Sequence, residues 1–374
     1  MNEPVWEDRL WPGLAPLREP LDTDLCVIGL GGSGLAAVGE ALAQGRSVVG
    51  IDAGSVAGGA AGRNGGFLLA GLAQGHHRAV EQLGRPLAAR LYQLTVEELQ
   101  RLTTATPEAI RRPGSVRIAD SPEEADDCRR HADALAADGF AVEPYDGPEG
   151  EGLLFPLDGA MQPLQRCRLL ALAAVAAGAT LAEHTRAVEI TGARVTTPDA
   201  TIRCRGVVIA VDGRLEQVVP ALAGEVRTAR LQMLATEPTD EVSFPRPVYA
   251  RWGYDYWQQL PDGRIALGGQ RDRYEAHEWT QDGMPTQEIQ TALDHLLRER
   301  VGVRSARVTT RWAAPVSFRR LGLLPVCRDV GGNVWAVGGY SGTGNIVGSL
   351  YGRAAACLAL GLPLPAGLDA LPVG

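Results

Sequence analysis

A glycine-rich turn between an apolar run and an alanine-rich segment most constrains what this chain folds into. The apolar run is residues 25–28, and Gly29, Gly31 and Gly34 then fit the spacing G-x-G-x-x-G. The segment 35–43 has the composition of a helix. The first glycine permits a tight turn, the second lets backbone N–H groups approach a pyrophosphate, and the third lets the helix pack closely on a sheet. This order predicts a dinucleotide-binding βαβ unit.

The second strand of that unit, residues 47–51, ends in an acid. Asp52 stands where a carboxylate accepts hydrogen bonds from a ribose diol, and Ala53 follows it. We expect the pyrophosphate at the helix N-terminus beside Ser33, because orphan N–H groups and the macrodipole favour negative charge there. An acid at position 52 disfavours NADP, since it would repel the 2′-phosphate. The alternative interpretation is a glycine-rich turn in another kind of α/β protein.

A second glycine-rich segment indicates which dinucleotide binds. It sets one cation and one amide among glycines, and its members are Gly62, Arg63, Asn64, Gly65, Gly66 and Phe67. A plain NAD-binding domain usually continues into a helix here. Such a loop can lie against a flat polar ring and present N–H groups to it, so it predicts FAD, with Arg63 as the cation near the ring. A surface ion pair is the alternative for Arg63.

This loop resembles the A-S-G-R-N-G-G motif of the FAD-dependent D-amino acid oxidase superfamily, in the branch of glycine oxidase, sarcosine oxidase and gamma-glutamylputrescine oxidoreductase. Residues 162–188, 262–269 and 334–345 resemble that family in the same order. The loop and the aromatic cluster 254–257 look closest to the gamma-glutamylputrescine branch. The resemblance implies FAD and an α/β fold, in which a Rossmann-like domain of the glutathione reductase type carries an inserted α+β substrate domain on an antiparallel sheet.

The resemblance also implies how the chain is divided. We expect the FAD-binding domain in three pieces, 1–80, 150–225 and 325–374, and the substrate-binding domain in 81–149 and 226–324. The implied cofactor contacts beyond the two loops are Ala187, Ala210, Gly213, Gly339, Gly342, Thr343, Gly344 and Asn345. Asp212 precedes Gly213 where the family usually has threonine, which leaves its contact open. The strand 334–337 and a helix over 345–360 would direct a helix N-terminus at the N1/O2 edge of the flavin; an ordinary glycine-rich helix start is the alternative.

Local patterns predict the remaining elements. Apolar residues recur at helical spacing over 76–104, and Ser121 is typical of an N-cap that opens a helix ending at Gly139. The run 207–211 predicts a buried parallel strand. Residues 226–324 read as an antiparallel sheet, with a helix over 285–301. The tryptophans of segment 1–23 favour an arm that packs onto the body over a disordered tail.

We expect the substrate-binding residues in the segments on either side of the turn at Asp262. If the flanking strands pair as a hairpin, Tyr254 and Tyr256 share one face, whereas Asp255 and Trp257 share the other. Aromatic walls attract an amine by cation–π interaction and exclude water, although core filling is the alternative for each ring. The candidate catalytic residues are Arg63, Tyr254, Tyr256, Arg271 and Tyr340. His76 and His77 could reach the site or cap a helix, and the cap is favoured.

One departure from the family favours an amine substrate. Amino acid oxidases of this family share a G-L-R-P segment whose arginine pairs with the substrate carboxylate, and the corresponding stretch 311–318 has no arginine at that position. Arg271 or Arg319 could substitute. We therefore expect FAD-dependent oxidation of a C–N bond in a primary or secondary amine, by hydride transfer to flavin N5. A D-amino acid or glycine-type oxidase is the alternative; an NAD-dependent dehydrogenase and a non-catalytic flavoprotein are less favoured.

Composition narrows the chemistry further. All 36 basic residues other than histidine are arginine, so Schiff-base chemistry is excluded and the lysine that helps sarcosine oxidase-like enzymes react with O₂ is missing. Oxidase and dehydrogenase both remain open, with O₂ or another electron acceptor. A net charge of −8 argues against nucleic-acid binding. The six dispersed cysteines predict no metal site. Cys327 could suggest a covalent flavin, as in sarcosine oxidases, but the residues around it do not match that pattern, so we expect noncovalent FAD and an inert cysteine. With neither a signal pattern nor an apolar span, we expect a cytoplasmic enzyme.

Overall fold

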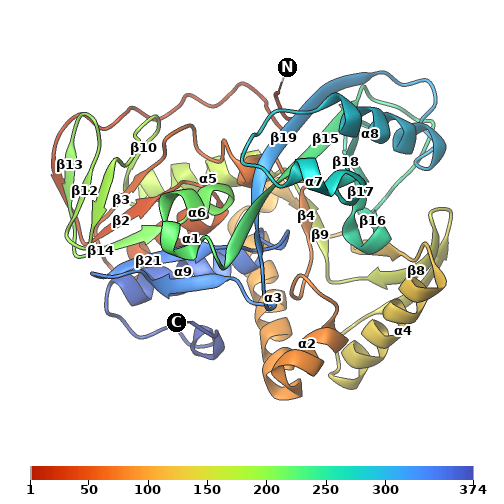
Figure 1. Cartoon of the computed structure of the whole chain (residues 1–374), viewed down its shortest axis with the longest axis horizontal. Coiled ribbons are helices and arrows are strands. Elements are labelled where there is room, and N and C mark those ends of the chain that lie inside the picture. The colour runs from red at the N-terminus through yellow and green to blue at the C-terminus, as the bar shows by residue number, and fades with distance from the viewer. Residues whose placement is uncertain (1, 374) are drawn as a thin grey trace. The chain divides into compact units, whose positions relative to one another are not determined.

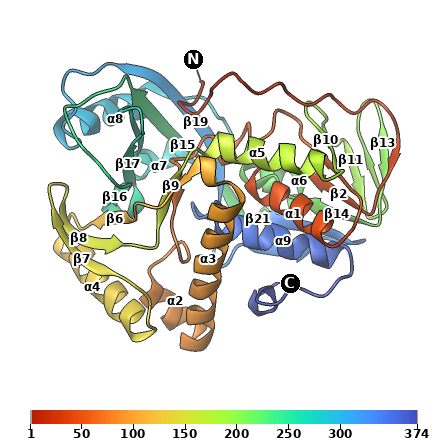
Figure 2. The same ribbon diagram turned by 180° about the vertical axis from the view of Figure 1, so that it is seen from behind.

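The computed structural model describes residues 2–373, which form two compact units (Figures 1 and 2). Unit 1 comprises residues 2–7, Arg63–Pro163 and Ala229–Pro315. Unit 2 comprises Asp8–Gly62, Leu164–Thr228 and residues 316–373. Each unit is therefore assembled from three separated stretches of chain, and each is described by itself.

A six-stranded, mostly parallel sheet is the centre of unit 2. Its order is β10 (Thr180–Ala182), β3 (Val48–Ile51), β2 (Leu25–Ile28), β14 (Gly206–Ile209), β21 (Val334–Gly338) and β20 (Val326–Asp329). The first five strands are parallel, and β20 runs antiparallel to β21. Every residue of β2, β3 and β14 is buried, as strands covered on both faces require. The strands predicted at 25–28, 47–51 and 207–211 are confirmed, the last ending two residues early.

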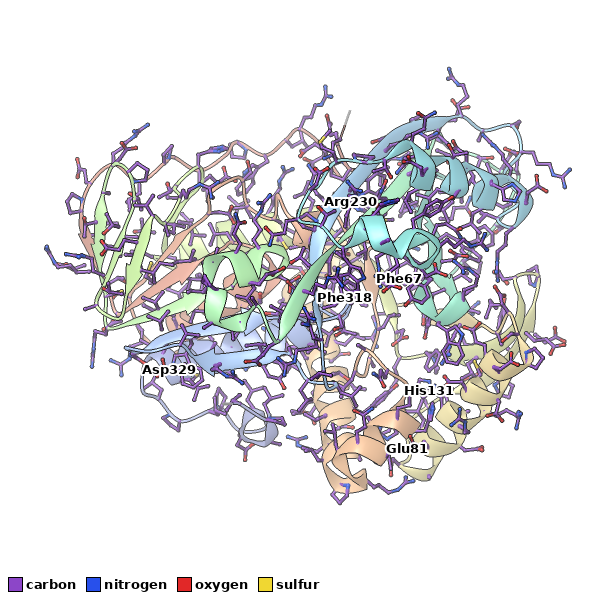
Figure 3. The ribbon with its side chains drawn as sticks, in the orientation of Figure 1. Phe67, Glu81, His131, Arg230, Phe318 and Asp329 are labelled. Carbon is purple, nitrogen blue, oxygen red and sulfur yellow. The ribbon has the colours of Figure 1, made fainter. Side chains whose placement is uncertain are left out.

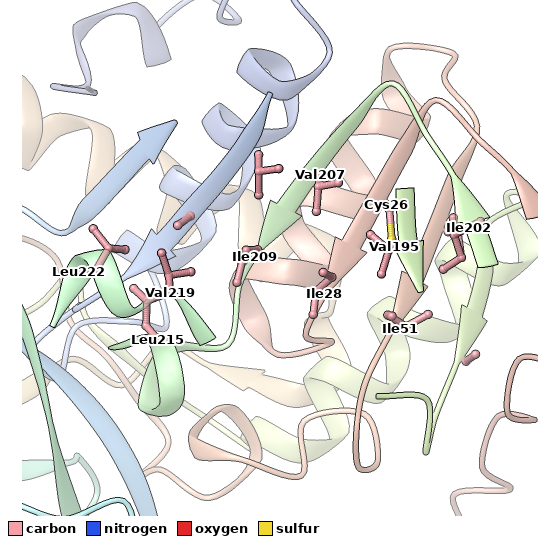
Figure 4. Close-up of a cluster of buried hydrophobic side chains, with 14 of the residues drawn as sticks. Cys26, Ile28, Ile51, Val195, Ile202, Val207, Ile209, Leu215, Val219 and Leu222 are labelled. Atoms are coloured by element: carbon pink, nitrogen blue, oxygen red, sulfur yellow. The ribbon is translucent and has the colours of Figure 1, made fainter. Parts of the chain in front are cut away.

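Helices and a small sheet cover the two faces of that sheet. The main helices of unit 2 are α1 (Gly32–Ala43), α5 (Pro163–Ala176) and α9 (Val347–Ala359), with the short α6 at Leu215–Val218. The small sheet has the order β1 (Leu21–Asp22), β13 (Thr201–Arg203), β12 (Arg194–Thr196) and β11 (Glu189–Thr191). Figure 4 shows Val195 and Ile202 of this sheet packed against Cys26 and Ile51 of the large one.

Helices α1 and α9 lie side by side (Figure 2) at very close range. A Cβ on Gly352 would stand 2.1 Å from the carbonyl oxygen of Ser33, so only glycine permits this approach. Arg353 Nε donates to Glu40 Oε2 at 2.8 Å along the same contact. Helix α9 begins at Val347, two residues later than predicted, because residues 343–346 form a turn instead.

An eight-stranded sheet is the frame of unit 1. Its order is β19 (Val308–Arg319), β15 (Val226–Thr236), β18 (Ile265–Gly269), β17 (Asp255–Gln259), β16 (Val248–Ala250), β6 (Ser115–Ile118), β8 (Gly150–Phe155) and β7 (Glu143–Gly147). Strand β15 begins in unit 2 and β19 ends there. Helix α8 (Gln287–Glu299) packs Ile289 and Leu293 into one core with Trp257. The antiparallel pairing of β15, β18, β17 and β16 and the helix predicted over 285–301 are confirmed.

Further helices and a small sheet of unit 1 come mostly before β6 in the sequence. A three-stranded sheet has the order β4 (Phe67–Leu68), β9 (Gly159–Met161) and β5 (Ile110–Arg111). In α4 (Pro122–Ala137), Ser121 Oγ accepts the Glu124 N–H at 3.2 Å, which confirms the predicted N-cap. The helical character predicted over 76–104 is confirmed, but it is divided between two helices. Two helices, α2 (His76–Leu83) and α3 (Arg85–Ala105), meet at Gly84, whose φ of +79° interrupts the helix.

The N-terminal arm packs onto the molecule, as predicted from its tryptophans. Trp6 is 3% exposed, and its Nε1 donates to the carbonyl oxygen of Asn64 at 2.9 Å in unit 1. In unit 2, Trp11 Nε1 donates to Glu183 Oε1 at 2.9 Å. Buried hydrogen-bonded indoles fix an otherwise extended segment.

Candidate active site

The turn between β2 and α1 is a cradle that only glycines can form. Gly29 has a φ of +100°, and a Cβ there would stand 2.6 Å from the carbonyl oxygen of Ala210. A Cβ on Gly34 would stand 1.8 Å from the carbonyl oxygen of Gly29. Gly31 is the N-cap without a side-chain cap, and the first turn of α1 contains no acid. An N-terminus of this kind fits the pyrophosphate of a dinucleotide.

Asp52 lies at the carboxyl end of β3, next to this turn. Its Oδ2 accepts the Leu30 N–H at 2.8 Å, and its Oδ1 accepts the Gly54 N–H at 2.8 Å. Burial raises the pKa of Asp52, while these two N–H groups oppose that rise. Ser33 is buried in the first turn of α1, and Ala53 is exposed beside Asp52. Asp52 thus orders the loop on either side of the predicted ribose position.

The buried guanidinium of Arg166 is a candidate cofactor-binding group that the sequence did not predict. Arg166 lies on α5 and is 1% exposed. Its Nη1 is 3.8 Å from the position a Cβ would take on Gly32, the first residue of α1. A charged residue at a buried position of a largely apolar helix is the signal that could have identified it.

The turn between β21 and α9 is the second candidate cofactor contact. Gly339, Ser341 and Gly342 all have positive φ, at +73°, +52° and +95°. The hydroxyl of Thr343 donates to the carbonyl oxygen of Tyr340 at 2.8 Å. Gly344 and Asn345 follow, half-buried, before the helix begins.

Tyr340 lies inside this turn. Tyr340 is 6% exposed. Its ring lies 3.2 Å and 3.3 Å from the positions that a Cβ would take on Gly344 and Gly348. Burial raises the pKa of Tyr340 well above its usual value, so the phenol stays neutral. The ring therefore packs against the first turn of α9.

Asp212, whose contact the sequence left open, ties this turn to a neighbouring strand. Its Oδ1 accepts the Gly339 N–H at 3.0 Å, and its Oδ2 accepts the Ser317 N–H at 3.2 Å. The Ser317 hydroxyl donates in return to the Asp212 carbonyl oxygen at 2.6 Å. Gly213 follows, buried, and Ala210 precedes with its N–H on the Ile28 carbonyl at 2.8 Å. Ala187 packs beside the core of this sheet.

In unit 1 the loop from Arg63 to Phe67 is held by its own polar side chains. Asn64 Oδ1 accepts the Gly66 N–H at 2.8 Å. Gly66 has a φ of +73°, and its carbonyl oxygen accepts the Met161 N–H at 2.7 Å. The Arg63 guanidinium donates to the carbonyl oxygens of Asn2 at 2.9 Å and Ala313 at 3.3 Å. Burial lowers the pKa of Arg63 from its usual value. Gly62 precedes the loop in unit 2.

The β17–β18 hairpin meets that loop. Tyr256 pairs with Gly268, and its ring is 2.5 Å from the Cβ position of Gly268 and 3.1 Å from that of Gly65. The same ring meets Phe67 edge to face, with centroids 6.0 Å apart (Figure 3 labels Phe67). The loop 63–67 and the β17–β18 hairpin, which lie far apart in the sequence, are thus in contact within unit 1.

Arg271 lies on the Tyr254 side of the hairpin. Its guanidinium carbon is 5.5 Å from the Tyr254 ring centroid and 5.0 Å from that of Trp279. The opposite face carries Asp255, which accepts bonds from Arg251 at 2.6 Å, and Trp257, which is in the core beneath α8. Within β17 the predicted separation is confirmed for Tyr256 on one face and for the buried Asp255 and Trp257 on the other, whereas Tyr254 precedes the strand in a helical turn.

Three more arginines form ion pairs with acids, Arg230 and Arg311 in unit 1 and Arg319 in unit 2. Arg311 Nη2 is 2.8 Å from Asp294 Oδ1, and Arg319 Nη1 is 2.8 Å from Glu225 Oε2. Arg230, labelled in Figure 3, lies 2.7 Å from Glu278 of α7 (Glu275–Glu278).

The two histidines do not cap α2 through their side chains. They lie buried in its first turn, where His76 Nε2 is 2.7 Å from Asp138 Oδ2 and His77 Nε2 is 3.2 Å from Asp127 Oδ1. Both acids lie on or directly after α4, so these rings join α2 to α4.

Cys327 of β20 is 4% exposed, and burial raises its pKa to about 12, so the thiol stays protonated at neutral pH. Within residues 2–373, no group of three or more His, Cys, Asp or Glu side chains could hold a metal ion. No helix in that part of the chain has both the length and the apolar character to cross a bilayer.

A family model described as "FAD dependent oxidoreductase", DAO, matches residues 24–358. The chain belongs to this family. It is thus an FAD-dependent oxidoreductase with the expected α/β architecture. The glycine cradle, which has no space for a Cβ, fits that cofactor.

Relatives and solved structures agree with the family. The probable oxidoreductase OrdL of Rhizobium meliloti is 28% identical, over 90% of this chain and 83% of that protein. Glycine oxidase from Geobacillus kaustophilus has a TM-score of 0.76 at 20% identity, covering 92% of this chain and 96% of its own. Iminodiacetate oxidase from Chelativorans has a TM-score of 0.69 at 18% identity, covering 94% and 99%. The gamma-glutamylputrescine branch stays a prediction.

Proposed function

We propose that this enzyme oxidises the C–N bond of an amine, with removal of a hydride from the carbon beside the nitrogen. FAD, when bound, accepts the hydride at N5. The observation that carries the proposal is the contact of Tyr256 with the loop 63–67, together with the Arg271–Tyr254 pair of the same hairpin, in unit 1. The β2–α1 turn and the turn 339–345 of unit 2 would hold the noncovalent cofactor, with Arg166 and Asp52 beside the former.

The residues of this chain have distinct proposed tasks. Tyr254 and Tyr256 offer aromatic faces to an amine and exclude water from it. Burial raises the pKa of Tyr256, so its phenol stays neutral and can donate a hydrogen bond. The α9 N-terminus supplies positive partial charge where negative charge develops on reduction. Arg63 contributes a cation, and Tyr340 supports the turn from inside.

Anaerobic single turnover tests the proposal. Each flavin reduced by an active amine should yield one imine, which hydrolyses to a carbonyl compound and ammonia or a smaller amine. Quantifying the carbonyl product against the loss of flavin absorbance checks this stoichiometry. Flavin reduction without any carbonyl product would contradict C–N oxidation while leaving FAD binding intact.

Oxidation of an amino acid or another amine with a carboxylate is the second candidate. The Arg271 guanidinium carbon lies over the rings of Tyr254 and Trp279, which help to hold the cation in place. Its N–H donors lie in the guanidinium plane, so this support is compatible with a bidentate contact to a carboxylate. The glycine and iminodiacetate oxidases named above also act, by their names, on carboxylated amines.

Substitution of Arg271 separates the two candidates. If Arg271 anchors a carboxylate, Arg271→Gln should raise KM for a carboxylated amine by about 10-fold to 100-fold, because a hydrogen bond to a charged group contributes about 1.5–3 kcal/mol. The KM for the matching amine without a carboxylate should stay the same. Arg273→Gln, at an exposed arginine of the same short helix, is the control. Equal effects on both substrates would count against the anchor.

A further inference from the structure

Asp212 occupies the point where three segments of unit 2 meet. It follows β14, and its two carboxylate oxygens bind different segments. Oδ2 accepts from Ser317 near the end of β19, whereas Oδ1 accepts from Gly339 at the start of the turn before α9. One side chain thus fixes the distance between a strand and the turn.

Hydrogen bonds in both directions connect Asp212, Ser317 and the turn. The Ser317 hydroxyl donates to the Asp212 carbonyl oxygen at 2.6 Å, and the Ser317 carbonyl oxygen accepts the Ser341 N–H at 3.1 Å. Behind Ser317, Thr228 Oγ1 lies 3.2 Å from its hydroxyl oxygen and donates to Glu216 Oε2 at 2.9 Å. The turn is therefore attached to Asp212 at Gly339 and to β19 at Ser341, and Thr228 of β15 links Ser317 to α6.

The backbone of Asp212 is itself in an uncommon conformation. Its φ is +27°, a region that residues other than glycine occupy only where their surroundings enforce it. Burial raises the pKa of Asp212 to about 6, against the N–H groups of Ser317, Gly339 and Tyr340, so the carboxylate is ionised at neutral pH. Strain and a partly buried charge are both maintained at this one junction.

We propose that Asp212 is a positioning residue for the turn 339–345, and that it sets how well the N–H groups of that turn stabilise charge on the reduced cofactor. The inference rests on the proposed contact of this turn with FAD, but not on the identity of the substrate. Asp212 acts through Gly339 and Tyr340, because its carboxylate is already bound to their backbone and to Ser317.

The midpoint potential of the bound flavin tests this role. Asp212→Asn keeps the volume of the side chain but replaces one acceptor oxygen with a donor, which cannot accept from the turn or from Ser317. If the turn loses its alignment, reduced FAD should bind about tenfold more weakly relative to oxidised FAD, as for one lost hydrogen bond to a charged group. The potential then moves to a more negative value.

Two further variants complete the experiment. Ser317→Ala removes the reciprocal hydroxyl and should shift the potential in the same direction by less, even if the Asp212 variant does not fold. Asp329→Asn, at an exposed acid that caps its own turn at 2.9 Å (labelled in Figure 3), is the matched control and should leave it unchanged. An unchanged or more positive potential in both Asp212→Asn and Ser317→Ala would overturn the inference, because loss of a negative charge alone raises it. Such a result would leave C–N oxidation intact.

Discussion

Single glycines decide whether the cofactor cradle forms. Gly34 and Gly39 both lie in α1, but a Cβ on Gly34 would meet a backbone oxygen at 1.8 Å, whereas nothing lies within 4 Å of one on Gly39. The same glycine-to-alanine substitution therefore meets a crowded backbone at Gly34 and open space at Gly39.

We predict opposite outcomes for alanine at these positions. Gly34→Ala should lower the free energy of unfolding by about 3 kcal/mol and abolish FAD binding at micromolar concentration, because the backbone must shift. Gly39→Ala should raise it by up to about 1 kcal/mol through helix propensity. Denaturant unfolding and FAD titration measure both; normal FAD affinity in Gly34→Ala would show that the turn does not hold the cofactor.

A buried acid in unit 1 gives the stability of the protein a pH dependence. Asp158 is 3% exposed and accepts bonds from Ser115 Oγ at 2.6 Å and the Ala70 N–H at 2.8 Å. Burial raises its pKa to about 7, against these bonds and the charge of Arg112. Between pH about 4 and 7 the folded state keeps a proton that the unfolded state has released.

The unfolding free energy should therefore fall as pH rises through that window, by up to about 1.4 kcal/mol per pH unit, and level off above it. Asp158→Asn should flatten this slope, and Asp146→Asn, at an exposed acid, should not. Urea unfolding at several pH values measures the difference. The same slope in both variants would mean that Asp158 is ionised throughout.

Among the elements, the contact between α1 and α9 connects the two turns proposed to hold FAD. Gly352→Ala should separate these helices at Ser33, since the new Cβ would lie 2.1 Å from its carbonyl oxygen. We expect a loss of about 1–3 kcal/mol in unfolding free energy together with weaker FAD binding. Gly224→Ala, at an exposed glycine with nothing within 4 Å of its Cβ position, is the control. Unchanged stability would imply that α9 adjusts freely.

Local signals explain which elements the sequence predicts well. The strand, glycine turn and helix at 25–43 follow from adjacent residues, and so does the N-cap at Ser121. Alternation along β17 likewise separates Tyr256 from Asp255 and Trp257. The break at Gly84 was missed because an isolated glycine does not disturb the apolar period of the two helices around it.

Nonlocal contacts explain what the sequence does not reveal. The partners of Asp212 come from segments more than a hundred residues away, so no pattern near it could predict them. The acid partners of Arg311 and Arg319 depend in the same way on the pairing of elements. Sequence could therefore propose the candidate arginines but could not rank them.

At the scale of the whole molecule, the absence of lysine bears on the electron acceptor. All 36 basic residues other than histidine are arginine. We predict that the substrate-reduced enzyme reacts slowly with O₂ and faster with an artificial acceptor such as a quinone or dye. Stopped-flow reoxidation compares the two rates directly. Reoxidation by air as fast as by the dye would show that an arginine replaces lysine in activating oxygen.

If this chain binds FAD and uses it to oxidise a C–N bond, both properties can be seen in the absorption spectrum of the purified protein, recorded before and after anaerobic addition of amines and amino acids. We predict a flavin band near ~450 nm that bleaches with at least one amine or amino acid and not with the corresponding alcohols. A protein that cannot be reconstituted with FAD, or whose flavin is reduced only by compounds without a C–N bond, would contradict the account.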